Sequence, residues 1–191
     1  MQYYNKNTTD DQKELLTEVD ENDNVIGPVA RETCHNQTTK PWHRTTSIYI
    51  FNVKGEIYLT RKSKTKDTGA SKLNISASGH VDFGDSYKET AKGELEEELG
   101  LNTELEEIDY LKIDTGYEKE FMKIYAGITK SRPEINKEEV EEIFTLDFHQ
   151  FMDDSKDRKF DFPPGAKDSI EQVLKTGSLE KIGRASCRER V

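Results

Sequence analysis

The sequence predicts a mixed β-sheet sandwiched between α-helices, a fold of the α+β or α/β class. Short apolar alternations typical of strands recur along the chain, a long amphipathic helix interrupts them near residues 85–99, and two shorter helical segments follow the last strands. The chain has 191 residues, which suits one domain with a sizeable core.

The N-terminal region is expected to form a small hairpin. Residues 1–12 are polar and are expected to be a flexible lead, and residues 13–181 would form the single domain. Alternating residues from Leu15 to Ile26 surround a turn-forming cluster at 21–24, which predicts the hairpin. An irregular connection is expected over 31–43.

The next segment predicts three more strands. Ser47–Asn52 and Ile57–Arg61 are expected to pair across the turn at 53–55. A basic loop, Arg61–Lys66, follows, and Leu73–Ala77 is expected to be a short strand.

One helix is defined by its ends as well as by its periodicity. Ser86 and Glu89 form a capping-box pattern, and Gly100 supplies a C-terminal stop. Between them, apolar residues recur every four positions at Tyr87, Ala91, Leu95 and Leu99.

The second half of the chain predicts two strands and two helices. The strands are expected at Leu105–Ile113 and Phe121–Thr129, and the helices near Asp147–Met152 and Gly165–Leu174. Residues 182–191 read like translated sequencing-adapter DNA, and we exclude them from the fold.

Composition narrows the function classes. The formal net charge is −10, and 35% of residues are charged against 32% hydrophobic, which argues against bulk nucleic-acid binding and suits a protein that gathers divalent cations. No apolar run approaches the roughly 20 residues that span a bilayer, and the N-terminus has no signal-peptide core. Of the two cysteines, Cys187 lies in the suspected adapter, which leaves Cys34 and predicts a reducing, cytoplasmic location.

The predicted helix carries three carboxylates on neighbouring positions. Glu94, Glu97 and Glu98 are spaced i, i+3 and i+4, so they share one face beside the apolar stripe. Hard oxygen ligands clustered in this way suit Mg²⁺ or Mn²⁺. A plain solvated acidic helix is the alternative.

The frame around these carboxylates resembles the Nudix box, a loop–helix–loop motif of fixed spacing. Seven specified positions match the family pattern: Gly79, Glu94, Leu95, Glu97, Glu98, Gly100 and Leu101. Asp85 stands where the family has Glu. Gly93 stands where the family has an Arg that would orient the carboxylates through charge-assisted hydrogen bonds.

This resemblance implies a Mg²⁺-dependent hydrolase of a small-molecule diphosphate, with Mn²⁺ as the other candidate cation. Glu94, Glu97 and Glu98 would be the catalytic residues and, with the Gly79 carbonyl, the metal ligands. A metal-activated water would attack one phosphorus. The general base stays open among four residues: Glu94, Glu118, Glu120 and Glu139. The acidic run around Glu139 reads equally well as a solvated loop.

The wider chain, roughly residues 14–175, resembles the Nudix branch that contains isopentenyl-diphosphate isomerase and its hydrolase relatives. The likeness rests on Val19-Asp20-Glu21, Val25-Ile26-Gly27, Arg31, His43-Arg44 and the run from Arg61 to Lys66. The resemblance implies a metal held by three His and two Glu, and the positions that match are His35, His43, His80, Glu118 and Glu120. His35 matches least well in spacing, and His149 is expected to have only a surface or hydrogen-bonding role.

Two further features bear on the reaction. The isomerase needs a cysteine where this chain has Ser78, and a hydroxyl is a poorer proton donor than a thiol near neutral pH. The resemblance also implies that Arg61, Lys62 and Lys66 bind the diphosphate; a solvated basic loop is the alternative.

Three functions therefore remain open. The first is hydrolysis of a nucleoside diphosphate derivative or a similar X-linked diphosphate. The second is isopentenyl-diphosphate isomerisation, which Ser78 disfavours. The third is a catalytically weak Nudix module that binds a phosphorylated ligand, which Gly93 makes credible. A homodimer is a common state in the family.

Overall fold

The computed structural model describes residues 4–5, 7–36 and 38–182. The segment interpreted as translated adapter, 182–191, lies outside the described residues except for Ile182. Within the described ranges, no helix is both long enough and apolar enough to cross a bilayer.

The sheet is organised around β3 (Trp42–Asn52). β8 (Lys119–Thr129) runs parallel to β3 along its whole length, and β7 (Glu106–Asp114) is antiparallel to β8. On its other edge, the middle of β3 pairs antiparallel with the short strand β6 (Ala77–His80).

A second group of strands surrounds β4 (Glu56–Lys62). β4 pairs antiparallel with β9 (Val140–Asp147) and with β5 (Leu73–Asn74), but it meets β3 only at Phe51 and Ile57. The two groups of strands therefore meet at this one pair and separate away from it. Side chains from both groups project into the space between them.

The N-terminal hairpin closes one end of this space. β1 (Leu15–Val19) and β2 (Val25–Ala30) pair antiparallel, as predicted. β1 contacts β3 where Glu18 lies opposite His43. The short helix α1 (Arg31–Cys34) follows β2 and leads directly to His35.

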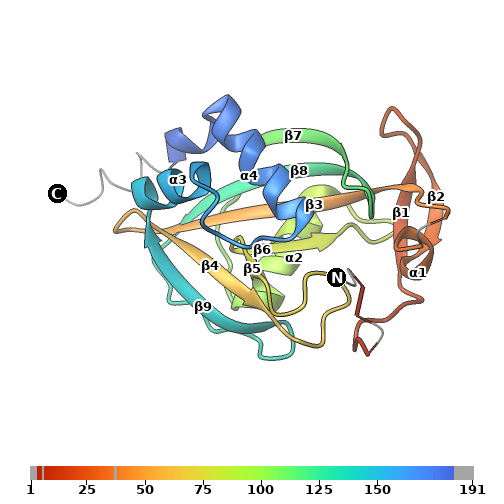
Figure 1. The fold of residues 1–191 in the computed structure, drawn as a ribbon, viewed down its shortest axis with the longest axis horizontal. Helices are drawn as coiled ribbons and strands as arrows, with labels where there is room; N and C mark the ends of the chain where they lie inside the picture. The colour runs from red at the N-terminus through yellow and green to blue at the C-terminus, as the bar shows by residue number, and fades with distance from the viewer. Residues whose placement is uncertain (1–3, 6, 37, 183–191) are drawn as a thin grey trace.

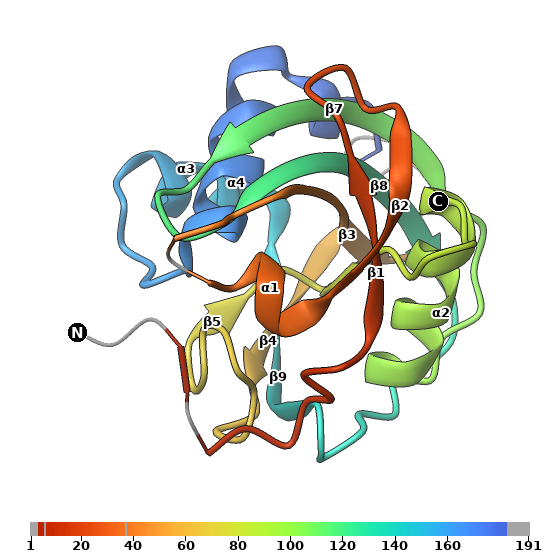
Figure 2. The same cartoon turned by 90° about the vertical axis from the view of Figure 1, so that its right-hand side faces the viewer.

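Helices cover the sheet on both sides, which confirms the predicted sandwich (Figures 1 and 2). Successive side chains of β3 point to opposite faces of the sheet and so reach both layers of helices. Ile48 and Ile50 pack with the buried stripe of α2 (Tyr87–Leu99). Tyr49 and Phe51 pack in a second cluster, with side chains of α3 (Phe148–Lys156) and α4 (Pro164–Thr176).

The ends of α2 are as predicted. The Ser86 hydroxyl accepts a hydrogen bond from the Glu89 backbone N–H, the Glu89 carboxylate accepts one from the Ser86 N–H, and Gly100 ends the helix with φ 63°. The predicted strands at 105–113 and 121–129 and the two later helices are also confirmed.

One predicted strand differs from the structure, and one strand of the structure is missing from the prediction. The expected strand Leu73–Ala77 is two strands, β5 and β6, because Ser76 interrupts the ladder: its hydroxyl accepts from Ile50 N and donates to Tyr58 O. Strand β9 was not predicted, because its glutamates read as part of a solvated acidic run. In the fold, β9 is paired along almost all of β4, and its exposed carboxylates point to solvent.

Candidate active site

A cavity lies where α2, β6, the start of β8 and the start of α4 meet. It collects most of the residues that the sequence singled out, namely Lys62, Lys66, Ser78, Gly79, His80, Glu94, Glu98, Glu118, Glu120 and Glu139. These come from segments up to 77 positions apart in sequence, so the fold rather than the local motif assembles the site.

Glu94 and Glu98, which we call the carboxylate pair, enter the cavity from one face of α2. Leu95 and Leu99 anchor the neighbouring stripe in the core. The carboxylate of Glu94 lies against Gly79 so closely that a Cβ at residue 79 would be 1.8 Å from Glu94 Oε1. Glu97, the third carboxylate of the motif, is exposed and does not line the cavity.

Burial disfavours the charged form of both members of the carboxylate pair. Burial raises the pKa of Glu98 to about 7, although Lys62 and Lys66 act in the opposite direction. Burial also raises the pKa of Glu94 well above its usual range, and repulsion from Glu98 adds to this. Two buried carboxylates that disfavour each other's charge form an oxygen-rich site, which a bound Mg²⁺ or Mn²⁺ would stabilise.

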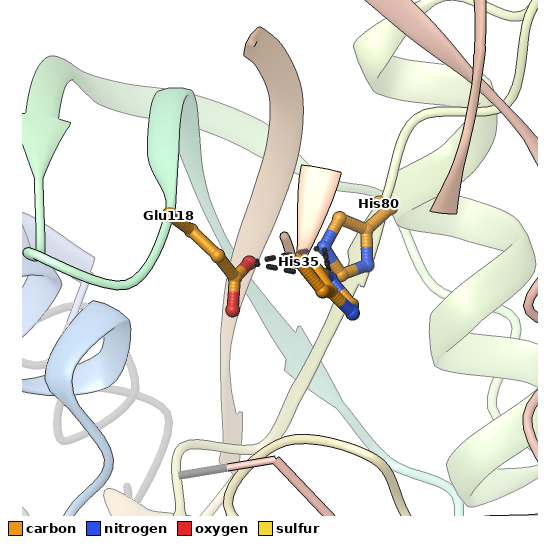
Figure 3. Close-up of side chains that lie close together, drawn as sticks. All are labelled: His35, His80 and Glu118. Atoms are coloured by element: carbon orange, nitrogen blue, oxygen red, sulfur yellow. Dashed lines mark hydrogen bonds and ion pairs between the residues drawn. The ribbon is translucent and has the colours of Figure 1, made fainter. Parts of the chain in front are cut away.

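A second group of ligands, the histidine cluster, consists of His35, His43, His80 and Glu118. Its centre is Glu118 Oε2, which lies 3.3 Å from His80 Nε2, 3.5 Å from His35 Nε2 and 3.7 Å from His43 Nε2. Figure 3 shows the side chains of His35, His80 and Glu118 directed toward one another. One ligand atom from each of these three lies within 4.8 Å of the others.

The members of the histidine cluster differ in charge. Burial alone would raise the pKa of Glu118, but the three histidines reverse this and hold it well below its usual range. Burial and the charge of Arg31 lower the pKa of His80 to about 3, so this imidazole is neutral near pH 7. Among the described residues, buried His43 Nε2 has no hydrogen-bond partner. Although burial opposes it, contacts with Cys34 and Glu118 raise the pKa of His43 well above its usual range, so this imidazole carries a proton without a metal and would release it on binding a divalent cation.

Glu120 lies next to the histidine cluster on β8. Its carboxylate accepts a hydrogen bond of 2.8 Å from Thr45 Oγ1. Burial, followed by repulsion from Glu118, raises its pKa to about 7. Glu118 and Glu120 therefore differ in protonation near neutral pH despite being two residues apart.

The three basic residues are placed differently. Lys62 and Lys66 line the cavity, and Lys66 Nζ contacts both Asp10 and Glu139 at 2.5 Å. Arg61 is not among the lining residues; its guanidinium lies 3.5 Å from Glu142 and over the ring of Phe144. His149 is exposed on α3, outside the cavity.

Several residues at the site carried no sequence signal. Tyr4, from the polar N-terminal lead, stacks on His35 with ring centroids 5.2 Å apart. Asp67 contacts His35 and Arg31. Asp67 lies directly after the basic loop Arg61–Lys66, and nothing in the local sequence pattern distinguishes it.

Comparison with known proteins decides the family. The model of the NUDIX domain matches residues 41–167, which include both α2 and most of the histidine cluster.

The chain belongs to the Nudix family.

The curated relatives of this Nudix protein carry two kinds of name. It is 30% identical to an isopentenyl-diphosphate Delta-isomerase of Serratia proteamaculans, over 74% of this chain and 81% of the relative. It is 32% identical to an uncharacterized Nudix hydrolase of Nostoc sp., over 70% of this chain and 80% of the relative. The fold resembles that of DR0079 from Deinococcus radiodurans, with a TM-score of 0.70 and 20% identity over 83% of this chain and 98% of that chain.

Proposed function

We propose that this Nudix protein is a Mg²⁺- or Mn²⁺-dependent hydrolase that cleaves the diphosphate linkage of a nucleoside diphosphate derivative or a similar X-linked diphosphate. The observation that carries the proposal is the carboxylate pair, with Glu94 held against Gly79 and Glu98 buried, in a cavity that also holds Lys62 and Lys66. The similarity to a protein named as a Nudix hydrolase supports the same reaction type.

The residues that line the cavity, together with His35 and His43 behind it, divide into three roles. Glu94 and Glu98, with the Gly79 carbonyl, would hold a cation, and the histidine cluster with Glu120 would hold another. A divalent cation supplies charge neutralisation at the phosphoryl oxygens and makes water more acidic. Lys62 and Lys66 would bind the diphosphate through charge-assisted hydrogen bonds.

The proton of the attacking water needs an acceptor with a pKa near neutrality. In the metal-free protein burial brings the pKa of Glu98 and of Glu120 to about 7, so either of them can accept this proton if it is not itself bound to the cation. Glu118 is a weak base, because the histidines hold its pKa low. Glu139 is already paired with Lys66.

Isopentenyl-diphosphate isomerisation is the second candidate. The arrangement of His35, His43 and His80 around Glu118 favours it, as does the similarity to the Serratia isomerase. The hydroxyl of Ser78 argues against it. This oxygen lines the cavity but accepts a hydrogen bond from Asn74 Nδ2 at 3.0 Å, and a serine hydroxyl gives up its proton far less readily than a thiol.

A phosphate-release assay tests the proposal. Purified protein would be incubated with Mg²⁺ or Mn²⁺ and a panel of nucleotide sugars, dinucleotides, nucleoside triphosphates and isopentenyl diphosphate. We expect metal-dependent cleavage of a panel member, and a loss of at least about 100-fold in kcat in Glu98→Gln, because the variant keeps the shape of the side chain but not its charge.

The matched control is Glu96→Gln, an exposed carboxylate on the same helix that does not line the cavity. It is expected to keep wild-type turnover. Isomerisation of isopentenyl diphosphate without cleavage would establish the second candidate. Ligand binding with neither reaction would identify a catalytically weak module.

A further inference from the structure

Asp67 lies on the loop between β4 and β5, behind the histidine cluster and not among the residues lining the cavity. Its side chain is only 3% exposed. One carboxylate oxygen, Oδ2, lies 3.0 Å from His35 Nδ1 and 2.8 Å from Arg31 Nε, and Oδ1 lies 3.2 Å from Arg31 Nη2. A buried carboxylate is thus shared between a histidine and a guanidinium.

The two nitrogens of His35 face different partners. Nδ1 faces Asp67, while Nε2 lies 3.3 Å from His80 Nε2 and 3.5 Å from Glu118 Oε2. A carboxylate beside one imidazole nitrogen places the proton on that nitrogen, and it leaves the lone pair of the other nitrogen free for a cation.

We propose that Asp67 is a positioning residue: it fixes the ring orientation and tautomer of His35 so that Nε2 faces the centre of the histidine cluster as a metal ligand. The inference rests on the proposed metal centre. The contact between His35 Nδ1 and Asp67 Oδ2 is an ion pair at 3.0 Å, and within the described part of the chain Nδ1 makes no hydrogen bond to another group.

Neighbouring groups hold this arrangement in place. Arg31 neutralises Asp67 and is itself paired with Glu14 at 2.6 Å, which ties the carboxylate to the segment before β1. Tyr4 stacks on His35, and the planes of the two rings differ by 19°. The ring of His35 is therefore confined between an aromatic face and a carboxylate.

Zinc binding tests the inference without requiring turnover. Zn²⁺ affinity of the metal-free full-length protein would be measured by competition with a chromophoric chelator. We expect Asp67→Asn to bind Zn²⁺ about 10- to 100-fold more weakly than wild type, the loss typical when a carboxylate behind a ligating histidine is removed. Asp153→Asn, an exposed aspartate on α3, is the control and should match wild type.

A double-mutant cycle distinguishes a positioning role of Asp67 from a general loss of structure at the site. If Asp67 acts through His35, Asp67→Asn should have little further effect on Zn²⁺ affinity in a His35→Ala background. An equal loss in both backgrounds, or unchanged affinity in Asp67→Asn, would overturn the inference. If Asp67→Asn does not fold, Asp67→Glu replaces it in the cycle, because it keeps the charge and shifts the oxygens by one methylene.

The outcomes of the Zn²⁺ experiment can be distinguished from those of the hydrolase assay. Zn²⁺ binding that depends on His35 but not on Asp67 would reject the positioning role alone. A wild-type protein with no Zn²⁺ site would reject the metal centre and this inference together. Neither result depends on whether the panel of diphosphates is cleaved.

Discussion

A Cβ at Gly79 would lie 1.8 Å from Glu94 Oε1, whereas a Cβ at Gly93 would meet no heavy atom within 4 Å. The first distance is far inside van der Waals contact, and the atom that it meets is a carboxylate of the proposed metal site. Gly79 therefore allows Glu94 to approach the backbone of β6, while Gly93 has no comparable packing reason to be glycine.

Gly79→Ala is expected to displace Glu94 and lower kcat by about 100-fold or more, a loss of the order seen when a group that stabilises the transition state is removed. Isothermal titration with Mn²⁺ should show weaker binding in the same variant. Wild-type Mn²⁺ affinity in Gly79→Ala would contradict the role of this close approach.

Gly93→Ala is expected to raise the free energy of unfolding by about 1 kcal/mol, because a glycine in an exposed helix interior is less favourable than alanine by that amount. Urea denaturation followed by circular dichroism measures this change. A destabilised Gly93→Ala protein would show that the empty space around residue 93 is needed for stability.

At the scale of elements, one carboxylate ties α4 to β7. Asp109 on β7 accepts hydrogen bonds from Gln172 Nε2 at 2.9 Å and from Thr176 Oγ1 at 2.6 Å. These bonds fix the C-terminal half of α4, whose first turn lies beside the cavity at Gly165 and Ala166.

Asp109→Ala is expected to lower the free energy of unfolding at pH 7 by about 1 to 2 kcal/mol, the usual worth of hydrogen bonds to a charged acceptor. Hydrogen bonds from the α4 side chains hold the pKa of Asp109 below its usual 3.8, although partial burial opposes them. The stabilisation is therefore complete above about pH 5 and is lost as the pH falls through the folded-state pKa.

Urea denaturation at pH 7 and at pH 3 measures both effects. Glu106→Ala, an exposed carboxylate on the same strand, is the control and should change stability little at either pH. A deficit in Asp109→Ala that stays equal at pH 3 would show that its ionised form is not what stabilises the contact.

At the scale of the whole molecule, the cavity has a cost in stability. Burial raises the pKa of Glu98 from 4.5 to about 7. The native state of the metal-free protein therefore binds more protons than the unfolded chain between these values, and stability falls as the pH rises from about 4.5 to about 7. One unit of pKa corresponds to about 1.4 kcal/mol, so the loss amounts to a few kcal/mol.

Glu98→Gln is therefore expected to be more stable than wild type at pH 8 without metal, and to lose this advantage at pH 4.5. Mn²⁺ should raise the melting temperature of wild type, since a ligand that binds only the native state stabilises it, and should raise that of Glu98→Gln less. Differential scanning calorimetry with a chelator or with Mn²⁺ measures both shifts. A less stable Glu98→Gln at pH 8 would contradict a raised pKa at Glu98.

The sequence alone determined the features that depend on near neighbours in the chain. The capping box at Ser86, the stop at Gly100 and the four-residue stripe are local, so the helix was predicted with its ends. The N-terminal hairpin and the strands at 105–113 and 121–129 follow from alternation. The resemblance of residues 79–101 to the Nudix box, and of the wider chain to one Nudix branch, identifies the family from the sequence alone.

Only the tertiary structure decided what depends on distant partners. The parallel pairing of β3 with β8 brings Glu118 beside three histidines from three other segments, and no local pattern contains that distance. Strand β9 was hidden because its pairing with β4, rather than its charged sequence, stabilises it. Asp67 is a single acidic residue in a charged loop until the fold buries it against His35 and Arg31, because burial and distance, not residue type, determine what a carboxylate does.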